Sequence, residues 1–135
     1  MMFMKPVLRE LPYLENWRWL SRRIRCALEP DEPRLIEHYL AEGRYLVCCT
    51  ETSSWTVALT AFRLLLDTAC DRMLPWHWHW RCLCLDQAWR PLLDLRNLDR
   101  QEQNQRWQPY ALQLANCRLL PSISPDELMQ GFDDE

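Results

Sequence analysis

Prolines divide this chain into segments, and they constrain its fold more than any other feature of the sequence. Proline fixes φ and has no backbone N–H, so it is tolerated in the first turn of a helix but ends or kinks a helix further along. Pro12 suits the first turn of a helix, whereas Pro30, Pro33, Pro75 and Pro121 follow apolar segments. We therefore expect regular elements to end at these four prolines.

Three of the segments show the spacing of an amphipathic helix, with apolar residues recurring at intervals of three and four. The middle helix follows Ser53 and Ser54, which are good N-cap residues, and it is the most apolar, so we expect it at the centre of the fold. Pro109 predicts a kink or a restart in the last helix. The three predicted helices are Leu11–Leu28, Trp55–Met73 and Asn97–Leu120.

A first β-hairpin is predicted over Arg34–Glu51. Leu35–Leu40 would form one strand and Arg44–Thr50, rich in aromatic and β-branched residues, the other, with Gly43 in the turn.

A second hairpin is predicted over Trp76–Arg96, with its turn at Asp86–Ala88. Pro91 cannot donate to a strand ladder, so the returning strand should lie at an edge or be bulged. The resulting order, α-β-β-α-β-β-α, predicts an α+β fold in which helices pack on a twisted antiparallel sheet.

The length of 135 residues is enough for one domain with one core. We assign residues 1–121 to a single protein-binding domain and residues 122–135 to an acidic, flexible tail. No apolar run approaches the roughly 18 residues of a membrane span, and Met1–Leu8 does not read as a secretory signal.

The seven cysteines are odd in number and irregularly spaced. Because nothing in the sequence marks secretion, free thiols in a reducing cytoplasm are the simplest account, with a disulfide framework as the alternative.

Charge and composition exclude some classes of function. A net charge of −3 argues against a dedicated nucleic-acid binder, although a local basic patch is compatible with it. With only two glycines, the chain has no glycine-rich loop to cradle a phosphate. Eight tryptophans exceed what a core of this size needs, which indicates a protein-binding surface.

The segment from His77 to Cys84 has the composition of a metal site. On a strand, however, His77 and His79 would point to one face and Cys82 and Cys84 to the other. One metal ion could not then bind all four side chains. We therefore predict no metal, no cofactor and no catalytic residue, and a protein that is not an enzyme.

The predicted contact surface lies on the second hairpin and on the first helix. An unpaired strand edge can receive an extended peptide, and exposed tryptophans mark protein contacts. Whether these tryptophans face a partner or the core stays open, and the arginines could face solvent, an acidic protein or nucleic acid. The predicted partner-binding residues are Trp78, Trp80, Trp89, Leu93, Arg18, Arg22 and Arg25.

The order of elements from Leu11 to Leu120 resembles the class I chaperones of bacterial type III secretion. Leu64–Leu66 through Leu83–Asp86 is similar to the central helix of that family passing into a strand that ends at an acidic turn, and Arg90–Leu95 is similar to the next strand. The resemblance implies a cytoplasmic homodimer or chaperone-like heterodimer that binds and masks or delivers a secreted effector.

Two departures from the family pattern favour a regulatory or apparatus-directed member, such as a chaperone-like regulator of an hrp-type virulence secretion cluster. The first helix is rich in Arg and Trp, and the glycines common around the family's hairpins are largely missing. The alternative function is a nucleic-acid-binding regulator of transcription that uses the Arg-rich first helix.

Overall fold

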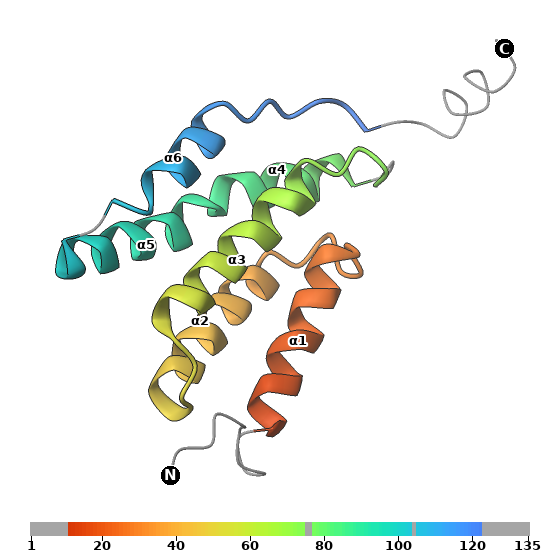
Figure 1. The fold of residues 1–135 in the computed structure, drawn as a ribbon. Coiled ribbons are helices and arrows are strands. Elements are labelled where there is room, and N and C mark those ends of the chain that lie inside the picture. The colour runs from red at the N-terminus through yellow and green to blue at the C-terminus, as the bar shows by residue number, and fades with distance from the viewer. Residues whose placement is uncertain (1–10, 75–76, 104, 123–135) are drawn as a thin grey trace, which may run out of the picture.

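The computed structural model describes residues 11–74, 77–103 and 105–122, and every regular element in these ranges is an α-helix (Figure 1). The predicted α+β fold with an antiparallel sheet is therefore wrong. The helices are α1 (Leu11–Arg25), α2 (Arg34–Cys49), α3 (Ser54–Ala69), α4 (Trp78–Gln87), α5 (Trp89–Glu102) and α6 (Gln108–Ala115).

The first predicted hairpin is the single helix α2. Gly43, expected in a turn, lies inside this helix and is buried. The buried residues of α2 follow helical spacing, which outweighs the β-branched and aromatic content that favoured strands. They are Leu35, Ile36, Tyr39, Leu40, Gly43 and Leu46.

The second predicted hairpin is the helix pair α4 and α5, which are joined at Ala88. Pro91 lies in the first turn of α5, where backbone N–H groups have no intrahelical acceptor, so the lack of an N–H costs no hydrogen bond. It therefore belongs to a helix start and does not mark a sheet edge. Trp80 and Cys84 are both fully buried, and their spacing of four residues places them on one face of α4.

The helices predicted around residues 11–28 and 55–73 are confirmed, with earlier ends at Arg25 and Ala69. The hydroxyl of Ser53 accepts a hydrogen bond from the backbone N–H of Thr56 at 3.4 Å, as expected of an N-cap. The helix predicted over residues 97–120 is wrong in extent, because α5 ends at Glu102 and Gln103 adopts a left-handed conformation.

After that break, α6 begins with Pro109 in its first turn. The restart predicted at Pro109 is therefore confirmed. The carboxylate of Asp99, itself buried, accepts a hydrogen bond from the backbone N–H of Trp107 and so holds the start of α6.

Helix α3 occupies the centre of the fold, as its apolar sequence predicted. It packs against α1 and α2 on one side and against α4 and α5 on the other (Figure 1). Phe62, Leu65 and Ala69 of α3 are completely buried. None of the helices in the described ranges has the length and apolar content needed to cross a membrane. Apart from Ser122, the predicted flexible tail lies outside the described residues.

Candidate functional site: an apolar groove between three helices

A cavity of about 340 Å³ lies where α2, α3 and α5 meet. Residues of these three helices line it, together with Trp17 from α1. Several of the lining residues, including Arg44, Cys48 and Asn97, are exposed, so the cavity is a groove that reaches the surface. Its apolar walls are formed by Leu40, Val47, Val57, Ala58, Ala61 and Leu98.

The inner wall of the groove is held by an aromatic pair. The rings of Trp17 and Tyr39 stack with centroids 5.0 Å apart and an interplanar angle of 4°. The indole Nε1 of Trp17 also donates a hydrogen bond to the carbonyl oxygen of Tyr39 at 3.0 Å. These two contacts fix α1 against α2 and give the groove a wall that cannot easily move.

Gly43 belongs to the same wall. A Cβ atom at this position would lie 3.0 Å from Cγ1 of Val57 and 3.2 Å from Nε1 of Trp17. Glycine therefore allows α2 to approach both α1 and α3 closely, and this close approach shapes the inner end of the groove.

The inner wall carries no buried charge. Burial raises the pKa of the Tyr39 phenol well above its ordinary value, so the hydroxyl is neutral at physiological pH. This hydroxyl is buried and has no hydrogen-bond partner among the described residues.

The rim of the groove is charged. Arg44 on α2 and Asp94 on α5 approach each other to 3.8 Å across it, with side chains that are 61% and 42% exposed. Such an exposed pair contributes little stability. Arg90 donates a hydrogen bond to the side-chain oxygen of Gln87 at 3.1 Å and forms no ion pair within the described part of the chain. Two guanidinium groups and one carboxylate therefore leave the rim with a surplus of positive charge.

The groove combines an apolar interior with a polar rim, a combination that is common in ligand-binding clefts. Its walls are apolar, and its rim presents guanidinium groups and the exposed amides of Asn97 and Gln101. Within the ranges that the structure describes, no group of three His, Cys, Asp or Glu side chains is placed to hold a metal ion. The strand alternation used to separate the His77–Cys84 side chains does not apply, because residues 78–87 are helical.

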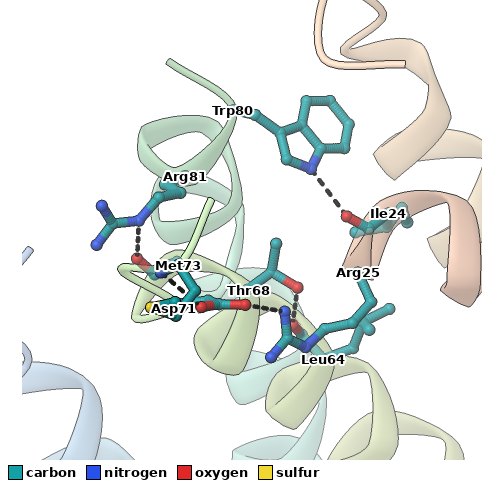
Figure 2. Close-up of polar contacts among 9 residues, drawn as sticks. Ile24, Arg25, Leu64, Thr68, Asp71, Met73, Trp80 and Arg81 are labelled. Carbon is teal, nitrogen blue, oxygen red and sulfur yellow. Dashed lines mark hydrogen bonds and ion pairs between the residues drawn. The ribbon is translucent and has the colours of Figure 1, made fainter. Parts of the chain in front are cut away.

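Trp80 does not form part of an exposed surface. It is completely buried, and its Nε1 donates a hydrogen bond to the carbonyl oxygen of Ile24 at 3.0 Å (Figure 2). It is a core residue whose hydrogen bond joins α4 to α1, so for Trp80 the choice between core and partner contact falls to the core.

The other predicted hairpin contacts are on the surface. Trp89 and Leu93 are 54% and 41% exposed and lie one turn apart on α5, and Trp78 is 45% exposed at the start of α4. None of the three lines the groove, although α5 supplies the rim residues beside Trp89 and Leu93.

The three arginines predicted as contacts on α1 also lie away from the groove walls. Arg18 and Arg22 are exposed, whereas Arg25 forms an ion pair with Asp71 at 2.7 Å (Figure 2). The sequence reasoning missed the groove because it assigned two of its three helices to strands. If residues 89–102 are taken as a helix, one of its faces is polar, and this face is the signal that could have located the rim. Its members are Arg90, Asp94, Asn97 and Gln101.

No protein-family model matches this chain, and no curated protein or solved structure matches it either. The hairpins that supported the resemblance to class I secretion chaperones are helices. The functional assignment therefore depends on the groove itself.

Proposed function

We propose that this protein is a non-enzymatic adaptor that binds an amphipathic helix of a protein partner in the groove between α2, α3 and α5. The observation that carries this proposal is the 340 Å³ apolar cavity bordered by a positively charged rim. A groove of this kind accepts apolar side chains spaced along one face of a helix, at positions i, i+3 or i+4, and i+7.

A helical partner fits this surface better than the extended peptide expected from the sequence. Strand addition needs an exposed sheet edge, and the described residues contain no strand. A groove between helices offers apolar pockets without a row of unpaired backbone groups.

The charge of the rim favours an acidic partner. Arg90 has no ion pair within the described residues, and Arg44 is paired with Asp94 only at 3.8 Å. A carboxylate beside the apolar face of the incoming helix would pair with either guanidinium group and orient the helix. Trp89 and Leu93 extend the apolar surface along α5 beyond the groove.

A cytoplasmic role in bacterial type III secretion is compatible with this mode of binding. An adaptor of this kind would mask the apolar face of an effector, or of a regulatory or apparatus protein, and deliver or sequester it. The same proposal includes a homodimer or a chaperone-like heterodimer.

The proposal is tested by selecting binders from a displayed library of helical peptides. The full chain serves as bait, and a Val47→Trp variant, whose larger side chain fills the groove, serves for counter-selection. We expect enriched peptides with a helical apolar stripe and acidic flanks. In solution, Val47→Trp should lower the affinity for the selected peptides by at least about tenfold. Arg90→Glu should lower it by about two- to fivefold, as for an exposed charge pair.

A matched control is Leu112→Trp, which adds the same side chain at an exposed position of α6, outside the groove. It should leave peptide affinity unchanged. Selected peptides that bind wild type and Val47→Trp equally would contradict the proposal. So would a small apolar molecule retained in the purified protein and detected by native mass spectrometry, because the groove would then be a ligand pocket.

A further inference from the structure

Two cysteines that are far apart in the sequence meet beside the end of α3. The sulfur atoms of Cys70, the C-cap of α3, and Cys117, just beyond α6, lie 3.3 Å apart. Cys70 is exposed and Cys117 is partly buried, so solutes can reach the pair. A disulfide bond would require the sulfur atoms to close to about 2.0 Å.

Cys117 begins a segment, residues 117–122, that we call the strap. The strap runs back across the fold from α6 toward α4 (Figure 1). The guanidinium group of Arg72 donates a hydrogen bond to the carbonyl oxygen of Pro121 at 2.9 Å. None of the residues of α6, which precedes the strap, is buried. Polar contacts therefore hold this end of the described chain together with partly buried apolar side chains, among them Leu114 and Leu119, that pack against the core.

The main polar contact of the strap is with Arg81 of α4. Its Nη2 donates to the carbonyl oxygen of Leu120 and its Nη1 to the hydroxyl of Ser122, both at 2.7 Å. Its Nε donates to the carbonyl oxygen of Ala69 at 2.8 Å (Figure 2).

Arg81 is completely buried, yet it forms no ion pair among the described residues. Burying a cation against neutral acceptors is costly unless those acceptors stay in place. The burial of Arg81 therefore depends on the strap remaining closed.

We propose that Cys70 and Cys117 form a reversible disulfide that fastens the strap over Arg81. A small-molecule disulfide such as oxidised glutathione is the oxidant. The thiolate of one cysteine attacks a glutathione sulfur, releasing one glutathione thiolate and leaving a mixed disulfide. The second cysteine, as its thiolate, then attacks the protein sulfur of that mixed disulfide and releases the second glutathione. Two protein thiols lose two protons and two electrons, and one glutathione disulfide becomes two thiols.

The environment of Cys70 makes this oxidation depend on pH. Although Cys70 is exposed, desolvation of its thiol, together with the hydrogen bond and the charge of Cys117, raises the pKa of Cys70 to about 11; Asp67 adds to this effect and Arg81 opposes it. Because only thiolates attack disulfides, the bond should form faster as the pH rises from 7 to 9.

The test uses the full chain in a series of glutathione buffers from reducing to oxidising at pH 8, quenched with acid and alkylated after denaturation. We expect two of the seven thiols to disappear together, and peptide mapping to show Cys70 linked to Cys117 within one molecule. The oxidised protein should unfold at a temperature higher by about 5–10 °C, because the bond closes a long loop. Trypsin should also cleave more slowly after Arg118, which lies in the strap.

Cys117→Ser and Cys70→Ser should abolish the shift in unfolding temperature, whereas the matched change Cys49→Ser, at another exposed cysteine, should leave it in place. Mapping of the wild type needs no variant, so the test holds even if a serine variant fails to fold. Full alkylation of both cysteines in the oxidising buffer, or bonds formed only between molecules, would overturn the proposal. A Cys70–Cys117 bond that changes neither the unfolding temperature nor cleavage at Arg118 would equally overturn it.

Discussion

At the scale of single residues, tryptophan has two distinct roles in this molecule. Trp80 is completely buried and hydrogen-bonded to Ile24, whereas Trp89 is 54% exposed. The two residues have the same chemistry, so composition indicates that some tryptophans are on the surface but does not say which. Only the tertiary structure separates them, because it buries Trp80 in the core, where its indole reaches Ile24 of α1.

Replacing each of these tryptophans by alanine should separate the two roles. Trp80→Ala should lower the free energy of unfolding by about 3–5 kcal/mol, because it leaves a cavity and an unpaired carbonyl at Ile24. Trp89→Ala should change it by no more than about 0.5 kcal/mol, as for an ordinary surface substitution. Urea denaturation of both variants measures the difference, and equal losses would show that Trp89 belongs to the core.

At the scale of the elements, the position of α2 depends on a single glycine. Gly43 has no Cβ to meet Val57 and Trp17, so α2 lies close to both neighbouring helices. Trp17 cannot move aside easily, since it is stacked on Tyr39 and hydrogen-bonded to its carbonyl. The inner end of the groove keeps its shape because α1, α2 and α3 are in close contact there.

Gly43→Ala should therefore destabilise the protein although alanine is the better helix former. Overpacking typically costs about 1–3 kcal/mol, and the gain in helix propensity returns about 1 kcal/mol. We expect a net loss of about 1 kcal/mol, measured by urea denaturation. In a double-mutant cycle with Val57→Ala, the added methyl group should cost less, because the space it needs has been opened. A stabilised Gly43→Ala variant would show that α2 and α3 are not in close contact.

At the scale of the whole molecule, an ion pair joins α1 to the segment after α3. Burial alone would raise the pKa of Asp71, but hydrogen bonds from the Arg25 guanidinium and from the backbone N–H of Met73 outweigh it and lower that pKa (Figure 2). The folded state therefore holds the Asp71 proton less tightly than the unfolded state. The stability that this pair contributes is present above the unfolded pKa of about 3.9 and is lost as the pH falls through the lower folded value.

Stability should accordingly fall as the pH is lowered below about 4, and part of that loss should be absent in Asp71→Asn. Thermal unfolding of the wild type and of Asp71→Asn between pH 3 and pH 7 measures this difference in pH dependence. The same change at Asp86, an exposed aspartate of α4 without an ion pair in the described residues, is the matched control. If the two asparagine variants have the same pH dependence, Asp71 does not contribute as stated.

The sequence by itself determined the local features of this protein. Ser53 caps α3, Pro109 marks the start of α6, and the apolar content of α3 places it at the centre, although α1 and α3 end at Arg25 and Ala69, several residues before the prolines expected to end them. Each of these signals acts through a hydrogen bond, a dihedral angle or a spacing within a few residues, so it can be read without knowing the fold.

Only the tertiary structure decided the rest. Segment 34–51 is rich in β-branched and aromatic residues and segment 76–96 is rich in tryptophan, which favoured strands. The structure instead has α2 packed on α1 and α3, and α4 and α5 packed on α3. The groove needs α2, α3 and α5 together, and the strap brings Cys117 to Cys70 across 47 residues. Such surfaces depend on contacts between distant segments, and those contacts leave no local pattern in the sequence.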